Sequence, residues 1–399
     1  MSLLFRSSCR RIFPRLLSTT TTTATTNTSE ASSNLSTMVR SLFREQDNDV
    51  LVARFNEFSS TSYHFRCKSE VYHIIIRRLA SAGRKDSISK ILEAQKLIPD
   101  VKTHQGFAGR IISLYGKAKM ADEAESTFYQ LPRTVQSFNT LLSAFNDAGE
   151  PQRAIDALNS IPLSKDCEEI VPDIYSYNIF MHAMCLKSDM EAAVEYLDTM
   201  ETKQVEPNVV TYCTIMSGYY RHGRIEDAEK VWEIMKVKNC SPDVKCYNSK
   251  IKALCSASEN RISEAEELIE VMKNTGLEPN GYSYTCLIIY HCKAGVLKNA
   301  KKVFEEMRKR NCEPNRITYE ALIPKLCEAE EFGPALKLCN LSVHKRLGVS
   351  AEVLQAVADG LAGHNNVDEA KKLVKFAWSS STPKYSGENL KMPPACLTD

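Results

Sequence analysis

The sequence has no long apolar run and no strong excess of either charge. Asn, His, Lys or Arg interrupts each apolar stretch well before the roughly 18 consecutive apolar residues that a membrane-spanning helix requires. The 51 Lys and Arg residues nearly balance the 49 Asp and Glu residues, for a formal net charge of +2. With 43% hydrophobic and 25% charged residues, the composition is typical of an ordered, soluble chain. We therefore expect a protein without a membrane span, and we exclude a disordered chain.

Cysteine is abundant, but cysteine motifs are missing. None of the 14 cysteines forms a C-x-x-C pair, and no His and Cys residues cluster at zinc-finger spacing. Four of them lie in apolar stretches at one shared position of a repeat: Cys185, Cys255, Cys292 and Cys327. We interpret these four as small, reduced core residues, and we expect no metal site and no cofactor.

Motifs of catalysis are missing as well. The chain has no P-loop, no G-x-G-x-x-G that opens a helix, no G-x-S-x-G elbow, and no H-x-E motif with the paired C-x-x-C of zinc deaminases. Its eight histidines are scattered. We therefore expect a protein that is not an enzyme and that has no small-molecule substrate.

The N-terminal segment differs from the rest of the chain. Four arginines alternate with apolar residues, a Ser/Thr-rich run follows at 18–28, and the first acidic residue is Glu30. Because such a start is typical of a mitochondrial transit peptide, we assign 1–36 to a transit peptide or disordered leader and expect the protein in the mitochondrial matrix. From Glu30 onwards the chain holds 47 basic and 49 acidic residues, a net charge of about −2. Nucleic-acid binding must then depend on a local groove rather than on an overall basic field.

A repeat of about 35 residues runs through the chain. Tyrosines recur at intervals of 35, 35, 37 and 35 residues: Tyr177, Tyr212, Tyr247, Tyr284 and Tyr319. The same frame aligns Ala124, Ala154, Ala193, Ala228, Ala265, Ala300, Ala335 and Ala370. It also aligns Met200, Met235, Met272 and Met307, and the closing Pro172, Pro207, Pro242, Pro279 and Pro314. A period of this length indicates a stacked array, because one unit is too small to bury its own apolar face.

Each unit is predicted to contain two helices. In the unit 209–243, apolar residues follow helical spacing up to Tyr219, and the segment 222–224, which contains Gly223, ends the first helix. A second amphipathic run at 225–238 ends before Pro242. We expect the recurring alanine to allow close helix packing and the tyrosines to lie mostly in the core.

Together these motifs resemble pentatricopeptide repeats. The resemblance rests on the 35-residue length, the V-T-Y opening, the G-R-x-x-D/E-A turn at 223–228, the E-x-M-K/R segment and the closing Pro-Asn or Pro-Asp. It implies an all-α fold, a right-handed α-solenoid of tandem helix-turn-helix repeats, of the P class and the plant mitochondrial type. The tetratricopeptide repeat, which binds peptides, is an alternative that lacks this Pro-Asn/Asp closure.

The resemblance also divides the chain into parts. An N-terminal helical cap is expected at 37–68, and a solenoid of about nine units at 69–385, with the best matches at 174–350. A disordered tail is expected at 386–399.

In pentatricopeptide repeats the fifth and the last residue of a unit together contact one RNA base. By resemblance, the base-reading pairs are Asn139/Asp173, Asn178/Asn208, Cys213/Asp243, Asn248/Asn280 and Thr285/Asn315, which suggest U, a pyrimidine, no clear base, a pyrimidine and A. The second residues Tyr175, Val210, Tyr282 and Ile317 would sandwich the bases, and the thirteenth residues Lys117, Arg221 and Lys293 would contact phosphate. Two units depart from the pattern, with Glu320/Ser350 and with Gln355. Alternatively, many of the Asn residues only satisfy turns and loop backbone.

The resemblance implies an RNA-binding protein that acts in mitochondrial RNA metabolism or translation, with single-stranded or ribosomal RNA as its partner. The first alternative is a structural component of the small subunit of the mitochondrial ribosome, where mitochondrial ribosomal proteins would be further partners. Short members with few base-reading pairs resemble such ribosome-associated proteins. A peptide-binding scaffold of the tetratricopeptide type is the second alternative.

Overall fold

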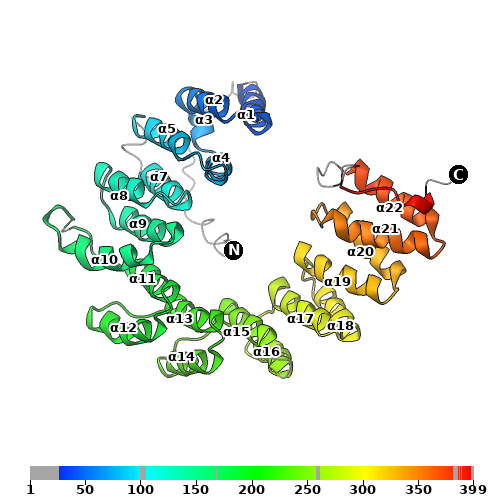
Figure 1. Cartoon of the computed structure of the whole chain (residues 1–399). Coiled ribbons are helices and arrows are strands. Elements are labelled where there is room, and N and C mark those ends of the chain that lie inside the picture. Colours follow the sequence, from blue (N-terminus) through cyan, green and yellow to red (C-terminus); the bar gives the residue numbers. More distant parts are fainter. Residues whose placement is uncertain are drawn as a thin grey trace, which may run out of the picture. The chain divides into compact units, whose positions relative to one another are not determined.

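The computed structural model describes residues 27–98, 105–167, 169–257, 261–380, 385, 387 and 389–396. All regular elements in these ranges are α-helices or short 3-10 helices that follow one another along the chain (Figure 1). The predicted all-α fold is therefore confirmed. Residues 1–26 of the expected transit peptide lie outside the described residues, so that assignment stays a prediction. None of the described helices is both long enough and apolar enough to cross a membrane.

The chain divides into two compact units, Met1–Pro132 and Arg133–Asp399. The described helices of the first unit are α1 (Asn27–Arg44), α2 (Asn48–Thr61), α3 (Tyr63–Arg66), α4 (Ser69–Ser81), α5 (Lys85–Lys96), α7 (Gln105–Lys117) and α8 (Ala121–Gln130). Phe55 of α2 packs edge to face against Phe65 of α3 and Tyr72 of α4, with ring centroids 5.3 and 4.8 Å away. The segment expected as an N-terminal cap thus shares a core with the first helical pair.

The second unit consists of seven consecutive helical pairs in its described part. They are α9 (Val135–Ala148) with α10 (Pro151–Ser160), α11 (Ile174–Leu186) with α12 (Met190–Thr202), α13 (Val209–Arg221) with α14 (Ile225–Val237), α15 (Val244–Ser256) with α16 (Ile262–Asn274), α17 (Gly281–Lys293) with α18 (Leu297–Lys309), α19 (Arg316–Glu328) with α20 (Phe332–His344), and α21 (Ala351–Gly363) with α22 (Val367–Ser379). Two short 3-10 helices, η1 (Ile161–Leu163) and η2 (Lys165–Cys167), follow α10.

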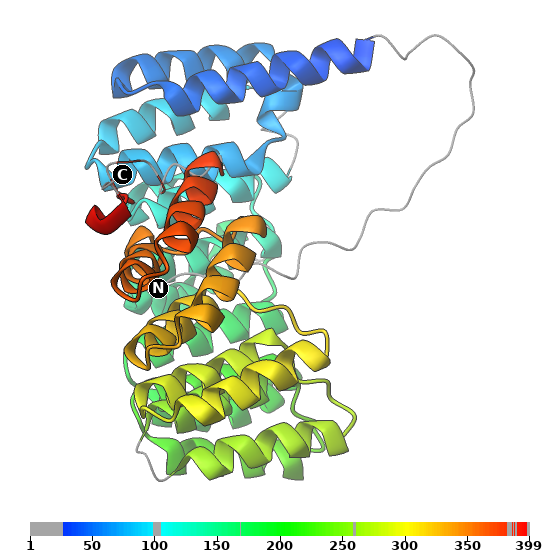
Figure 2. The same ribbon diagram turned by 90° about the vertical axis from the view of Figure 1, so that its right-hand side faces the viewer.

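The pairs stack in two layers. The first helix of each pair contacts the first helix of the next pair, from α9 through α21, and each also contacts the second helix of its own pair. Figure 2 shows the helices from α15 to α20, in green to orange, lying one above the next. This repetition of neighbour contacts is an α-solenoid.

The recurring residues form the core between the layers. All eight aligned alanines are fully buried, and so are the four aligned methionines. The aligned tyrosines are at most 7% exposed, which confirms their predicted core position. An alanine methyl group lets two helix backbones approach closely, whereas a larger side chain would force them apart.

The turn between the two helices of a pair needs a left-handed residue. Helix α13 ends at Arg221 and α14 begins at Ile225, as predicted, with Gly223 at φ +72° between them. Glycine adopts this conformation at little cost because it has no Cβ. The equivalent residues of other pairs include Ser188 at φ +65° and Glu330 at φ +57°.

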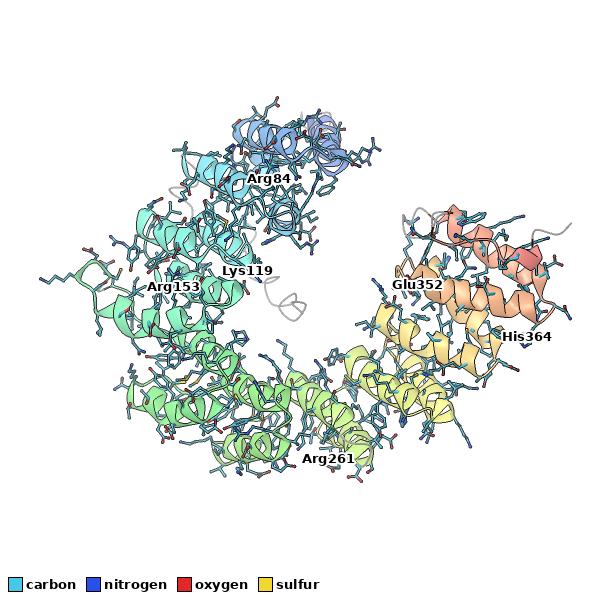
Figure 3. The ribbon with its side chains drawn as sticks, in the orientation of Figure 1. Arg84, Lys119, Arg153, Arg261, Glu352 and His364 are labelled. Carbon is cyan, nitrogen blue, oxygen red and sulfur yellow. A yellow bond between two sulfur atoms is a disulfide. The ribbon has the colours of Figure 1, made fainter. Side chains whose placement is uncertain are left out.

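Ion pairs connect the second helices of neighbouring pairs. Arg261, labelled in Figure 3, lies 3.2 Å from Glu226 and 3.0 Å from Glu264. Lys273 is 2.8 Å from Glu306 of the following pair. Ion pairs at a protein surface add little stability, but these pairs neutralise basic side chains on the layer of second helices.

The segment after α22 packs back onto the last pair. Trp378 Nε1 donates to the carbonyl of Leu390 at 3.0 Å, Leu390 is fully buried, and a 3-10 helix η5 (Pro394–Cys396) contacts α22. The described residues of the segment expected as a disordered tail are therefore ordered against the solenoid, because they cover its otherwise exposed last apolar face.

Candidate nucleic-acid interface

Three of the predicted base-reading pairs are hydrogen-bonded in the structure. The side-chain amide of the fifth residue donates to the last residue of the same unit, which lies at the start of the next first helix. The distances from Nδ2 to Oδ1 are 3.0 Å for Asn139 and Asp173, 3.5 Å for Asn178 and Asn208, and 3.3 Å for Asn248 and Asn280. The solenoid thus brings together residues that are 30 to 34 positions apart in sequence.

A third residue holds each of these pairs. The hydroxyl groups that donate to Oδ1 of the fifth residue are Ser176 to Asn139 at 2.5 Å, Thr211 to Asn178 at 2.6 Å, and Ser283 to Asn248 at 2.5 Å. Each hydroxyl belongs to the third residue of the following unit and is buried. The sequence prediction missed these residues, although the recurrence of Ser or Thr three positions after an Asn or Asp marks a capping box.

The last residue of each pair also caps a helix. Asn208 Oδ1 accepts hydrogen bonds from the backbone N–H groups of Val210 at 3.0 Å and Thr211 at 3.1 Å, at the start of α13. The same role recurs at α11, α15, α17 and α19, with Asp173, Asp243, Asn280 and Asn315. The alternative interpretation was that these residues only satisfy backbone groups. Capping of the next helix is indeed one function of the last residue of each unit.

The pair Thr285 and Asn315 is joined indirectly. Thr285 Oγ1 lies 2.8 Å from Thr318 Oγ1, and Thr318 Oγ1 donates to Asn315 Oδ1 at 3.2 Å. Thr285 Oγ1 also donates to the backbone carbonyl of Gly281 at 2.6 Å. The Thr285 hydroxyl thus makes hydrogen bonds with both Gly281 and Thr318.

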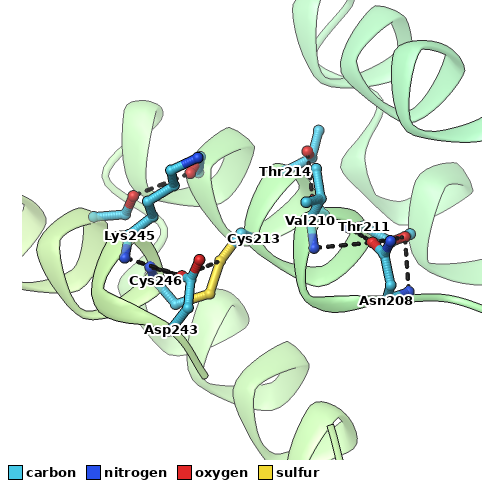
Figure 4. Close-up of a disulfide and its surroundings, with 10 residues drawn as sticks. Asn208, Val210, Thr211, Cys213, Thr214, Asp243, Lys245 and Cys246 are labelled. Atoms are coloured by element: carbon cyan, nitrogen blue, oxygen red, sulfur yellow. Dashed lines mark hydrogen bonds between the residues drawn. A yellow bond between two sulfur atoms is a disulfide. The ribbon is translucent and has the colours of Figure 1, made fainter. Parts of the chain in front are cut away.

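The pair Cys213 and Asp243 has a different chemistry. Cys213 forms a disulfide with Cys246, and its Sγ is 4.0 Å from Asp243 Oδ1 (Figure 4). Cys246 occupies the third position, where the other junctions carry Ser or Thr. The possible ligand atoms of Cys213, Asp243 and Cys246 lie within 4.8 Å of one another, the one such group in the described part of the chain. Because the sulfur atoms of Cys213 and Cys246 are bonded to each other, Cys213 presents no thiol to a base.

The predicted base-sandwiching residues are exposed beside the pairs. Tyr175, Val210, Tyr282 and Ile317 are 68, 52, 37 and 55% exposed. Second and fifth residues are three positions apart on a helix, so they lie on one face. Exposed apolar and aromatic side chains therefore stand next to the paired amide groups, an arrangement that suits stacking on a base.

The predicted phosphate contacts lie at the other end of the first helices. Lys117, Arg221 and Lys293 are exposed and are the last residues of α7, α13 and α17. Eight residues of helix, roughly 12 Å, separate a thirteenth from a fifth residue. Arg221 and Lys293 are therefore about two helical turns away from Cys213 and Thr285, the fifth residues of their own helices. A cation in the last turn also stabilises the helix dipole.

Glu320 and Gln355, which depart from the repeat pattern, make contacts within the protein. Glu320 Oε1 accepts from the backbone N–H of Ser350 at 2.9 Å and lies 2.8 Å from Arg316 Nε. Gln355 Oε1 accepts from the backbone N–H of Lys391 at 2.8 Å, which places the C-terminal segment over the last pair. The hydrogen-bonded amide pairs therefore all lie in units that precede these two.

The four aligned cysteines are not part of the disulfide, and each carries a free thiol. Cys185 and Cys292 are buried, and Cys255 and Cys327 are half-buried. Burial raises the pKa of Cys185 and of Cys255 to about 12, and of Cys292 to about 11. These thiols are therefore protonated at neutral pH and unsuited to nucleophilic or ligand roles.

Parts of the chain are similar in sequence to a known repeat family and to known proteins. A model of the PPR repeat family matches residues 172–219, 208–256 and 282–328, and a PPR repeat model matches 110–133. Small ribosomal subunit protein mS78 of Arabidopsis thaliana is 38% identical over 164 residues, which are 40% of this chain and 40% of that relative. A mitochondrial pentatricopeptide repeat-containing protein of the same plant is 30% identical over 200 residues, 49% of this chain and 47% of the relative. Each match spans less than half the length of the relative.

Among solved structures, the maize pentatricopeptide repeat protein PPR10 is similar, with a TM-score of 0.41 and 17% identity over 86% of this chain and 58% of that chain. That likeness is too low to bear on function. The matched repeats, the stacked helical pairs and the closing Pro-Asn/Asp motifs agree in their positions. Residues 110–133, 172–256 and 282–328 of the chain therefore match pentatricopeptide repeats.

Proposed function

We propose that this protein binds single-stranded RNA in mitochondria through the row of amide pairs at its repeat junctions, and that it does so without catalysing a reaction. The observation that carries the proposal is the recurring geometry of fifth, last and second residues. At Asn178, for example, the amide meets Asn208 while the ring of Tyr175 on the same helix face is exposed. Such a site offers hydrogen-bond donors and acceptors to a base edge and a surface for stacking.

The hydrogen bonds within each pair fix the orientation of the amide groups. In the pair of Asn248 and Asn280, Oδ1 of Asn248 accepts from Ser283 and one hydrogen of its Nδ2 points to Asn280. The second Nδ2 hydrogen of Asn248 and the Nδ2 group of Asn280 then remain as donors for a ligand, whereas Asn280 Oδ1 already accepts from Tyr282 and Ser283. A preorganised group of this kind loses little conformational entropy when it binds.

The mitochondrial location rests on two supports. One is the basic, acid-free leader of the sequence. The other is the similarity to a mitochondrial protein and to a small ribosomal subunit protein.

Binding of the purified chain to labelled RNA tests the proposal. We expect a pyrimidine-rich oligonucleotide to bind more tightly than a purine-rich one of equal length. The variant Asn178→Ala/Asn248→Ala should bind it at least about tenfold more weakly, since each lost hydrogen bond is worth roughly 1 kcal/mol. Asn340→Ala, at an exposed position of α20, is the matched control and should bind like the wild type. Equal binding by all three proteins would remove the pairs from the mechanism.

A structural role in the small subunit of the mitochondrial ribosome is the second candidate. The similarity to ribosomal protein mS78 favours this role. The small number of hydrogen-bonded amide pairs favours it as well. Sedimentation of the endogenous protein from a mitochondrial lysate, with and without EDTA, distinguishes the two. Stoichiometric migration with the small subunit after subunit dissociation indicates a ribosomal component, whereas a slow, nuclease-sensitive peak indicates a free RNA-binding factor.

A further inference from the structure

The junction between α13 and α15 differs from the other junctions in one respect. Its fifth residue is Cys213 and the third residue of the next unit is Cys246, where the junctions of Asn139, Asn178 and Asn248 have an amide and a hydroxyl. A covalent bond between the two sulfurs takes the place of the hydrogen bond that holds the other pairs. The register of the solenoid thus sets two cysteines at positions whose side chains are also in contact at the junctions of Asn139, Asn178, Asn248 and Thr285.

The backbone geometry of this junction fits a disulfide. The Cα atoms of Cys213 and Cys246 are 5.4 Å apart, within the range of about 4.4 to 6.8 Å that disulfides occupy. Asn178 and Thr211, at the equivalent positions of the preceding junction, already lie in hydrogen-bonding contact. No movement of the helices is therefore needed to form the bond or to break it.

The disulfide is accessible from one side. Cys246 is buried with 1% of its surface exposed, whereas Cys213 is half-buried. Figure 4 shows the bond beside Asp243, the proposed partner of Cys213 in base contact. Oxidation would therefore begin with the thiolate of Cys213, which attacks glutathione disulfide to form a mixed disulfide and release one glutathione thiol. The thiol of Cys246 would then displace the second glutathione as a thiol and complete the protein disulfide.

We propose that Cys213 and Cys246 are a reversible thiol–disulfide couple that controls base binding at the middle junction of the interface. In the oxidising direction, the two thiols and one glutathione disulfide give the protein disulfide and two glutathione thiols. Glutathione accepts the two electrons and two protons, and the reverse reaction restores both cysteine thiols. The oxidised junction has no S–H donor at Cys213 and is fixed covalently, whereas the reduced junction presents a thiol next to Asp243 and is free to adjust to a base.

The part of this inference that concerns RNA rests on the proposed function, and the experiment separates the two. The purified full chain is equilibrated with either glutathione disulfide or glutathione, and a peptide digest is analysed by mass spectrometry for the peptide that joins Cys213 to Cys246. Affinity for the pyrimidine-rich oligonucleotide is measured on the same samples. We expect the joined peptide only in the oxidised sample, together with an RNA affinity about fivefold lower than in the reduced one, which corresponds to about one hydrogen bond.

Variants identify the residues responsible. Cys246→Ser introduces the residue type found at the third position of other junctions and should fold, and its RNA affinity should not depend on glutathione. Cys213→Ser should behave in the same way. Cys312→Ser, at a half-buried cysteine outside the pair, is the matched control and should keep the wild-type difference.

The outcomes are distinct. Absence of the joined peptide after oxidation overturns the couple, and equal affinity of both samples, when both bind RNA, overturns the control of binding. If neither sample binds RNA, the proposed function fails and the control of binding fails with it.

Discussion

A Cβ atom on Gly218 of α13 would lie 2.7 Å from Sγ of Cys185 on α11. The two residues mark a close approach between neighbouring first helices, since the Cβ of Cys185 and Cγ of Met190 would be 3.0 Å away as well. The register between the helices, and with it the contact between Asn178 and Thr211, depends on this close approach.

Gly218→Ala should therefore destabilise the solenoid. The added methyl group forces α11 and α13 apart or displaces Cys185, at a cost of about 1 to 3 kcal/mol. Urea unfolding followed by circular dichroism measures the change, and Gly218→Ala/Cys185→Ala should regain part of it because the smaller side chain makes room. Wild-type stability of the single variant would show that the helices are not in this contact.

Gln204→Gly should stabilise the protein. Gln204 follows α12 with φ at +59°, and the equivalent residue after α16 is Gly276 at φ +76°. A residue with a Cβ in this conformation costs roughly 1 kcal/mol relative to glycine, so the midpoint of thermal unfolding should rise. The converse variant, Gly276→Gln, should lower it, and since nothing lies near a Cβ built on Gly276, the effect would be conformational only.

Substitutions at Asn208 should separate its two roles. Asn208→Ala removes the cap of α13 and should cost about 1 kcal/mol of stability, whereas Asn208→Ser keeps a capping oxygen and should cost less. Asn178→Ala removes no cap, but it loses the hydrogen bond from the buried Thr211 hydroxyl and should also cost about 1 kcal/mol. If RNA binding weakens in all three variants, the loss follows the amide pair, whereas a loss confined to Asn208→Ala would follow the cap.

Reduction of the disulfide should lower stability. Cys213 and Cys246 are 33 residues apart, and closing a loop of that size stabilises a protein by roughly 3 to 4 kcal/mol through the entropy of the unfolded chain. The urea midpoint of the wild type should fall on addition of dithiothreitol. Cys213→Ser/Cys246→Ser should show one midpoint in both conditions, and a wild type that behaves like this variant would contradict the prediction.

Acid should weaken the solenoid near α11. Burial, together with the charge of Arg221, holds the pKa of His182 below its ordinary value. The unfolded chain then binds a proton more readily than the folded chain, so His182 contributes stability that is present above its unfolded pKa of about 6.5 and is lost as the pH falls below it. Unfolding measured at pH 7.5 and at pH 5.5 should show a smaller loss of stability for His182→Gln than for the wild type.

Much of the fold could be predicted because its core positions repeat. Tyr212, Ala228 and Met235 recur in register and are all buried, and the helix boundary at Gly223 lies where the sequence placed it. The ordered C-terminal segment was not predicted. Its contacts, such as Trp378 with Leu390, occur once and have no period to mark them.

The candidate site was predicted in part. The fifth and last residues were identified through the family resemblance, and they do lie together at Asn139 and Asp173. Ser176, which holds that pair, was missed because a serine near a helix start has several possible roles and only the neighbouring helix shows which one it fills. The cations Arg221 and Lys293 are the last residues of α13 and α17, and their contact with phosphate stays a prediction.

The sequence by itself determined the period, the helical pairs and the buried face, because apolar spacing and turn residues act locally along the chain. Only the tertiary structure decided which side chains meet across a junction, since that depends on the register between neighbouring helices. The bond between Cys213 and Cys246 is the clearest case. Their spacing in sequence follows no cysteine motif, and the packing of α13 against α15 alone brings their sulfur atoms together.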